Sequence, residues 1–298
     1  MKIVIAGGSG FLGNALEKYL IEKKHQVIIL SRNQTKQNQV YWDANSLGNW
    51  VSELENADVL INMTGKSVDC RYNEGNRKQI LASRINSTNV LQEAIDKCKC
   101  PPKVWLNASS ATIYIHAETQ LMDEEKGIIG DDFSMNICKA WEAAFFKKEN
   151  TNVRKVALRT SIVLGNDGGA FQKIKAISRL GLGGKQGHGE QMMSWIHIED
   201  FCRAVEYIIN DESIVGAINI TAPTPVKNTD FMQQLRKLMS IPFGLSSPVF
   251  ILELAAIFIG TETELLLKSR NVYPKKLLES GFSFKFPNHT SAIQNLLA

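Results

Sequence analysis

Along the first half of the chain, short runs of branched apolar residues alternate with longer segments in which apolar residues recur every three or four positions. The short runs are typical of buried parallel strands, and the longer pattern is typical of helices with one buried face. Strands are predicted over residues 3–6, 26–30, 57–63, 103–108 and 155–159, and helices over 12–20, 83–97 and 138–148. This alternation predicts an α/β fold, a doubly wound parallel sheet of the Rossmann type.

The sequence changes in character after Gly165. Residues 165–189 are rich in glycine, and a helix over 198–209 and a strand over 217–220 precede a largely helical pattern. We therefore expect a Rossmann core over residues 1–164 and a smaller, mainly helical C-terminal lobe over 165–298, with 195–221 returning to the core. The lobe is expected to cover the carboxyl ends of the strands, where ligands of such sheets bind.

The most apolar stretch is PVFILELAAIFIG, residues 248–260. It is too short to cross a bilayer and it carries Glu253, so a membrane span is not expected. A buried helix or a helix at an interface is the expected structure.

Composition and charge narrow the classes of partner. The 298 residues are 44% hydrophobic and 21% charged, which is typical of a globular protein with a sizeable core. A net charge of +4 without a long basic run argues against nucleic acid and acidic membranes. The five cysteines form neither a disulfide framework nor a zinc spacing, so we expect reduced thiols, no metal site and a cytoplasmic location. The N-terminal run shows no leader pattern.

A glycine-rich loop follows the first predicted strand and opens the first predicted helix. Glycines at 7, 10 and 13 allow, in turn, a tight turn, close approach of a pyrophosphate to the backbone, and close packing of helix on strand. The N–H groups at the start of the helix would hold the phosphates. A purely structural turn is the alternative. The dinucleotide-binding residues predicted in this loop are Gly7, Ser9, Gly10, Phe11, Leu12 and Gly13.

The end of the second strand predicts which dinucleotide is bound. A site for NAD usually carries Asp or Glu there for the ribose hydroxyls, whereas this chain has Ser31 and Arg32. A guanidinium can bind a 2′-phosphate through two hydrogen bonds, so NADP is favoured over NAD. The alternative is that Arg32 is an ordinary solvated loop residue.

Several motifs extend this pattern over nearly the whole chain. They are NMTG at 62–65, ASSATIY at 108–114, RLGLGG, GHGEQ, SWIHIED, APTPVKN and the C-terminal PKKLLESGFSFKFP. With them the chain resembles the extended short-chain dehydrogenase/reductases, and within these an atypical epimerase-like family. The resemblance implies further cofactor contacts at Met63, Thr64, Gly65, Arg84 and Cys138.

The resemblance also identifies a departure from the family's chemistry. Extended enzymes use a serine, matched here by Ser110, and a Tyr-x-x-x-Lys pair, whose positions are occupied by Ser134 and Cys138. Serine is a far weaker acid than tyrosine, and a neutral thiol cannot supply the charge of lysine. Ser110 and Tyr114 are the predicted catalytic residues, with packing as the alternative role for Tyr114.

Two functions remain open at this point. The first is an NADP-dependent oxidoreductase or epimerase that acts on a small carbonyl or sugar-like substrate, with the cofactor carrying the hydride chemistry. The second is a non-catalytic regulator or scaffold that binds the dinucleotide. A small-molecule substrate is the expected partner, and a homodimer is left open.

Overall fold

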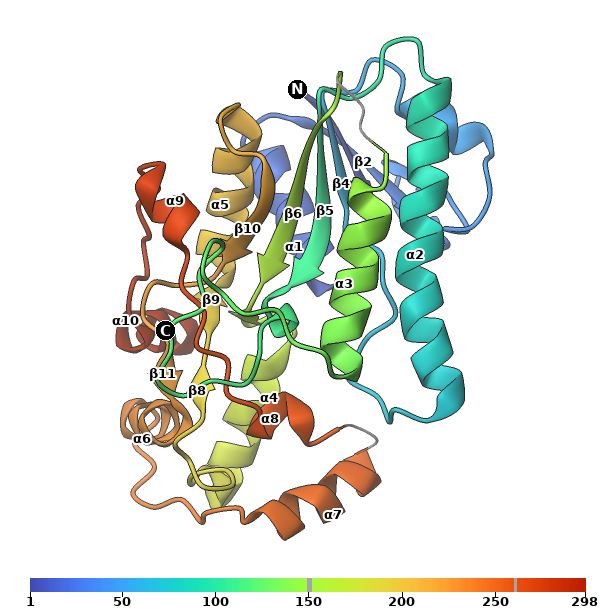
Figure 1. The fold of residues 1–298 in the computed structure, drawn as a ribbon. Coiled ribbons are helices and arrows are strands. Elements are labelled where there is room, and N and C mark those ends of the chain that lie inside the picture. Colours follow the sequence, from blue (N-terminus) through green and yellow to red (C-terminus); the bar gives the residue numbers. More distant parts are fainter. Residues whose placement is uncertain (149–151, 260–261) are drawn as a thin grey trace.

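Seven parallel strands form the central sheet of the protein, in the order β10-β6-β5-β4-β1-β2-β3. The computed structural model describes residues 1–148, 152–259 and 262–298. The chain order reverses between β1 and β4, which are neighbours in the sheet (Figure 1). The strands are β1 Lys2–Ala6, β2 Gln26–Ser31, β3 Gln39–Tyr41, β4 Val59–Asn62, β5 Val104–Ser110, β6 Arg154–Thr160 and β10 Gly216–Ile220.

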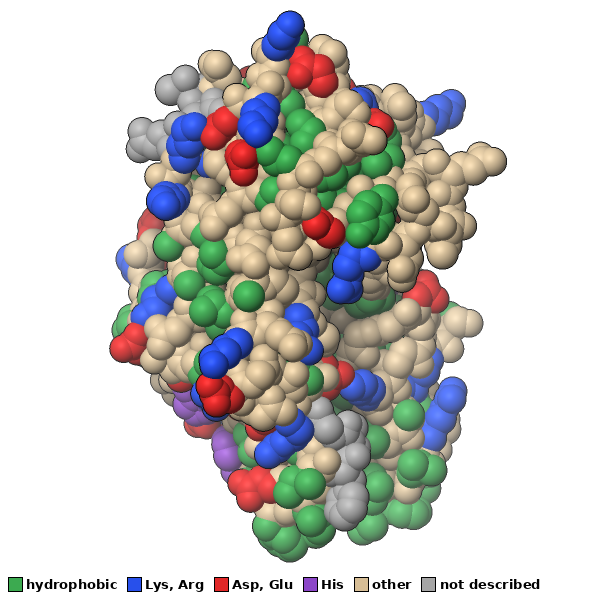
Figure 2. Space-filling view, turned by 90° about the vertical axis from the view of Figure 1, so that its right-hand side faces the viewer, with side chains coloured by type: hydrophobic (Ala, Val, Ile, Leu, Met, Phe, Trp, Pro, Cys, Tyr) green, Lys and Arg blue, Asp and Glu red, His purple; other side chains and the backbone are tan. Residues whose placement is uncertain are grey.

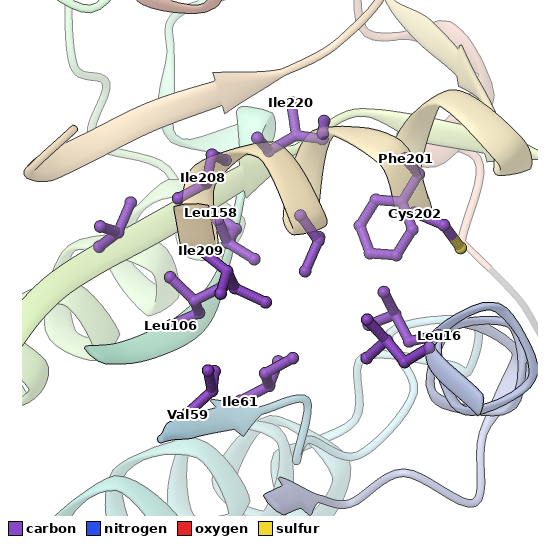
Figure 3. Packing of buried hydrophobic residues seen from close by; sticks show 14 of the residues in the cluster. Leu16, Val59, Ile61, Leu106, Leu158, Phe201, Cys202, Ile208, Ile209 and Ile220 are labelled. Carbon is purple, nitrogen blue, oxygen red and sulfur yellow. The ribbon is translucent and has the colours of Figure 1, made fainter. Parts of the chain in front are cut away.

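Helices cover both faces of the sheet because successive residues of each strand point to opposite sides. Ile3 and Ile5 face the layer of α1 (Phe11–Glu22) and α5 (Ile198–Asn210). Figure 3 shows Leu16 of α1 and Phe201 of α5 meeting strand residues there. Val4 and Ala6 face the opposite layer, formed by α2 (Glu74–Lys97) and α3 (Phe133–Phe146).

A lower part of the molecule lies beyond the carboxyl ends of the strands (Figure 1). Its own core brings together Phe171, Trp195, Phe231 and Ile293. The remaining helices are α4 Ala170–Ile177, α6 Asn228–Leu238, α7 Val249–Ile259, α8 Glu264–Leu267, α9 Lys275–Glu279 and α10 His289–Leu297, with short helices η1 Asn49–Glu53, η2 Ala111–Ile113 and η3 Ser178–Leu182. Two small sheets pair β7 (Ile162–Leu164) with β9 (Trp195–His197), and β8 (Met192–Met193) with β11 (Val226–Lys227).

The C-terminal segment is fastened to the core through Asp200 of α5. This carboxylate is fully buried and accepts hydrogen bonds from the backbone N–H groups of Lys285 and Phe286, at 2.9 and 2.7 Å. Arg203 donates to the same carboxylate at 2.6 Å. Leu277 and Phe282 then extend the core on the α1 and α5 face of the sheet.

The predicted fold class is confirmed, and the five predicted strands are present with small shifts at their ends. The helix predicted over 83–97 begins earlier, at Glu74, where the Asn73 side chain accepts a hydrogen bond from the Asn76 N–H. The helix predicted over 138–148 likewise begins at Phe133, capped by Asp132. The first turn of α2, EGNR, is polar and carries no apolar periodicity, whereas the first turn of α3, FSMN, carries only two apolar residues. The division into a core over 1–164 and a lobe over 165–298 stays a prediction.

One expectation about α7 is wrong. The sequence offered a buried helix as one alternative, yet Phe250 and Ile257 are 67% and 61% exposed. Figure 2 shows apolar side chains gathered at the lower end of the face it presents. The alternative, an interface helix, stays a prediction. Among the described residues, no helix combines the length and the apolar character that a membrane span requires.

Candidate functional site

The candidate site lies where the loops after β1 and β4 meet at the carboxyl edge of the sheet. The backbone N–H of Gly7 donates to the Leu30 carbonyl at 2.9 Å, and that of Met63 donates to the Ala6 carbonyl at 2.8 Å. The chain therefore leaves β1 and β4 at this edge and enters a loop directly after each strand. Because the strand order reverses between β1 and β4, this is the switch point at which doubly wound sheets bind ligands.

The three glycines of the first loop occupy three different environments. Gly7 has φ +73°, and a Cβ built there would lie 2.6 Å from the Thr64 Oγ1. A Cβ on Gly13 would lie 2.4 Å from the Gly8 Cα, so only glycine lets α1 pack this closely on the loop. A Cβ on Gly10 would meet no atom within 4 Å in the described part of the chain. The space above Gly10 is therefore open for a ligand.

The start of α1 faces that open space. Gly10 is its N-cap residue, with no side-chain hydrogen bond in the capping role, and the Ser9 carbonyl accepts one from Asn14 at 3.0 Å. Backbone N–H groups at such a helix start attract phosphate oxygens. Phe11 and Leu12 pack their side chains against the core, so only their backbone N–H groups are suited to a cofactor contact.

The two residues predicted to select the phosphate, at the end of β2, differ in exposure. Ser31 is buried, and its hydroxyl accepts a hydrogen bond from the Asn33 N–H at 3.2 Å, which holds the turn. Arg32 is exposed, and no hydrogen bond or ion pair engages its guanidinium among the described residues. An unengaged guanidinium beside the loop fits a 2′-phosphate.

The loop after β4 holds an unpaired polar atom. Thr64 Oγ1 is buried without a hydrogen-bond partner in the described residues, although the Thr64 N–H is held by Asn62 Oδ1 at 3.0 Å. A buried hydroxyl of this kind is costly unless a ligand or water completes it. The glycine loop, Arg32 and Thr64 together fit a phosphorylated dinucleotide.

Arg84 lies over the same loop. A Cβ built on Gly65 would be 3.1 Å from the Arg84 Cζ, and the guanidinium donates to the carbonyls of Lys66 and Ile80, both at 3.0 Å. It also stacks over the Trp141 ring at 4.9 Å. Burial lowers the pKa of the Arg84 guanidinium.

Cys138 is buried beside Ala111 and Ile113, which follow β5. Burial raises the pKa of its thiol to about 12, although the charge of Arg84 opposes this rise. The group is therefore a neutral thiol near pH 7 and lacks the thiolate that nucleophilic attack requires.

The predicted catalytic residues have different surroundings. Ser110 ends β5 at the carboxyl edge, is partly exposed, and its hydroxyl donates to Thr112 Oγ1 at 2.9 Å. Tyr114 is fully buried, where its phenol donates to Asn219 Oδ1 at 3.0 Å and accepts from Arg159 at 2.8 Å. Burial raises the pKa of Tyr114. This environment supports a packing role for Tyr114, and its catalytic role stays a prediction.

The surroundings of Ser134 were not anticipated from the sequence. Its hydroxyl donates to Glu264 Oε1 of α8, and Glu264 pairs with Lys268 at 3.0 Å. Lys268 also binds Asp132, the residue that caps α3. Figure 1 shows α8 beneath the first turn of α3. No spacing in the sequence joins these positions, because they lie 130 residues apart.

Within the part of the chain that the structure describes, no three or more His, Cys, Asp or Glu side chains are grouped so that they could hold a metal ion.

Comparison with known proteins identifies the family. A model of the NAD dependent epimerase/dehydratase family matches residues 3–221, and a domain of unknown function, DUF1731, matches residues 247–296. The chain belongs to the NAD dependent epimerase/dehydratase family. The resemblance to the atypical, epimerase-like short-chain dehydrogenase/reductases is thereby confirmed.

Individual relatives span the whole chain. Epimerase family protein YfhF of Bacillus subtilis is 34% identical and covers 100% of this chain and 98% of its own. The crystal structure of human epimerase family protein SDR39U1 with NADPH superposes with a TM-score of 0.90 at 30% identity, covering 99% of both chains. A nucleoside-diphosphate sugar epimerase from Corynebacterium glutamicum gives a TM-score of 0.82 at 27% identity, over 100% of this chain and 58% of the other.

Proposed function

We propose that this protein is an NADP-dependent oxidoreductase or epimerase that acts on a small carbonyl or sugar-like compound. The observation that carries the proposal is a set of three features at one edge of the sheet: open space above Gly10, the exposed guanidinium of Arg32, and a buried Thr64 hydroxyl that no described residue pairs. The NADPH in the crystal structure of human SDR39U1, a relative with the same fold, supports this choice of nucleotide.

The residues of the site have distinct roles in the proposal. Backbone N–H groups from Gly10 to Leu12 bind the pyrophosphate, and Arg32 selects the 2′-phosphate by a charge-assisted pair of hydrogen bonds. When bound, the reduced nicotinamide supplies hydride to the carbonyl carbon. Ser110, partly exposed at the end of β5, turns its hydroxyl proton from Thr112 Oγ1 to the carbonyl oxygen when substrate binds and so polarises the carbonyl.

A second candidate function is supported by a specific observation. Ser134 and the neutral Cys138 occupy the positions of the family's Tyr and Lys, so the usual acid and its activating charge are missing there. A regulator that binds the dinucleotide without turnover is the function this observation favours.

The Ser110→Ala variant separates the two functions. Purified protein is incubated with NADPH and a panel of aldehydes, ketones, quinones and keto-sugars, and absorbance at the nicotinamide band is followed. We expect turnover by the wild-type protein and a loss of roughly 10- to 100-fold in kcat for Ser110→Ala, since one donor to the developing oxyanion is lost.

The matched control is Ser52→Ala, which removes an exposed hydroxyl in η1. Its activity should equal that of the wild type. Tight NADPH binding without oxidation of any member of the panel, the same in wild type and Ser110→Ala, would establish the regulator instead.

A further inference from the structure

Tyr72 lies beside the position at which the family's catalytic tyrosine is replaced. It belongs to the loop between β4 and α2, and its backbone N–H donates to Glu262 Oε1 at 2.6 Å. Its ring packs edge-on against Phe133, with centroids 5.0 Å apart and planes at 63°. Both the backbone and the ring of Tyr72 are therefore fixed next to the first turn of α3.

The Tyr72 phenol lies near the Ser134 hydroxyl and the Glu264 carboxylate, on the side of the ring that packs against Phe133 at the start of α3. Ser134 in turn donates to Glu264, whose carboxylate is held by Lys268. Position 134 thus does not present its own hydroxyl freely to a substrate. It supports a phenol that arrives from another loop and occupies the same neighbourhood.

We propose that Tyr72 is the catalytic acid of this site, taking over the task of the tyrosine that position 134 lacks. The inference rests on the proposed function. As the carbonyl carbon receives hydride from NADPH, the C=O π electrons take the phenol proton and an alcohol forms. The remaining phenolate recovers a proton from water, which reaches the half-exposed side chain.

The groups around Tyr72 influence the pKa of its phenol. Glu264 and Glu262 contribute negative charge, Cys70 lies close by, and Arg84 contributes a positive charge. Burial and the Glu264 carboxylate raise the pKa of Tyr72 to about 12. The phenol therefore stays protonated at neutral pH, so it donates a proton and is a poor base.

The first test needs no substrate. Tyrosine labelled with ¹³C at Cζ gives one signal for each of the six tyrosines, and Tyr72→Phe identifies the signal of Tyr72. We expect this signal to shift when NADP⁺ is added, because the proposal places the phenol beside the nicotinamide. We also expect Glu264→Gln to lower its ionisation midpoint by roughly one pH unit, since a like charge is removed. A signal that responds to neither change overturns the assignment.

The second test measures reduction of a carbonyl from the panel. Tyr72→Phe keeps the ring packing on Phe133 and should lower kcat by roughly 10²-fold or more, with the NADPH dissociation constant unchanged. Tyr19→Phe is the matched control, because it removes a phenol bonded to Glu206 on the opposite face of the sheet from α2 and α3.

Chemical rescue excludes a merely structural role for the ring. In Tyr72→Gly, added phenol should restore part of the rate, whereas toluene, which has the same shape without the hydroxyl, should not. Turnover that survives Tyr72→Phe overturns this inference alone. Absence of turnover in the wild type, despite tight NADPH binding, overturns it together with the enzymatic function.

Discussion

Arg32 is the exposed residue predicted to select NADPH over NADH. In Arg32→Asp a carboxylate replaces the guanidinium and repels the 2′-phosphate. NADPH binding should weaken by roughly 100-fold or more, because charge-assisted hydrogen bonds contribute about 1.5–3 kcal/mol each. NADH binding should change little, since NADH carries no phosphate there. Calorimetric titration with both nucleotides measures the difference.

Arg179→Asp has the same change of charge at an exposed position of η3 and is the control for Arg32→Asp. It should leave the preference for NADPH intact. An equal loss of NADPH and NADH affinity in Arg32→Asp would show that this guanidinium does not bind the 2′-phosphate.

In the unit formed by the glycine loop and α1, substitution of one glycine should affect cofactor binding and substitution of another should affect stability. Gly10→Val should abolish NADPH binding, because the valine side chain enters the open space in which the pyrophosphate is predicted to bind. Its free energy of unfolding should fall by only about 1 kcal/mol. Gly13→Ala should instead destabilise the fold by several kcal/mol, since its Cβ would lie 2.4 Å from the Gly8 backbone. Thermal unfolding and nucleotide titration of both variants separate stability from binding. Retained NADPH binding in Gly10→Val would refute the predicted loop.

Elements were predicted well where their signal is local. The branched run of β1 and the glycine loop are identified by a few neighbouring residues, because strand burial and backbone conformation act over that range. The start of α2 was missed because Asn73 caps it inside polar sequence, and the start of α3 was missed because the capping role of Asp132 was not recognised. The short β3 was missed because three residues carry too little pattern.

Asp200 joins the C-terminal segment to the sheet core at the scale of the whole molecule. Asp200→Ala would remove the acceptor of the Lys285 N–H, of the buried Phe286 N–H and of the Arg203 guanidinium. We expect a loss of about 3–5 kcal/mol and a Tm lower by roughly 6–15 °C, with the chain still unfolding in one transition. Scanning calorimetry measures both quantities.

Glu93→Ala, which removes an exposed pair with Lys97, should change stability by less than about 0.5 kcal/mol. Two separate transitions in Asp200→Ala would contradict the view that the C-terminal segment and the sheet form one cooperative unit.

The sequence by itself determined the parallel sheet, the glycine loop after β1 and the basic residue at the end of β2. These depend on local pattern and on the backbone freedom of glycine, which the chain carries wherever it folds. The tertiary structure alone decided what surrounds Ser134. Glu264 reaches Ser134 from a helix 130 residues away, and Tyr72 packs on the neighbouring Phe133 from a loop whose backbone is held by Glu262. Long-range contacts of this kind leave no periodicity or spacing in the sequence. The sequence therefore showed that position 134 lacks a tyrosine, but it did not show that Tyr72 lies nearby.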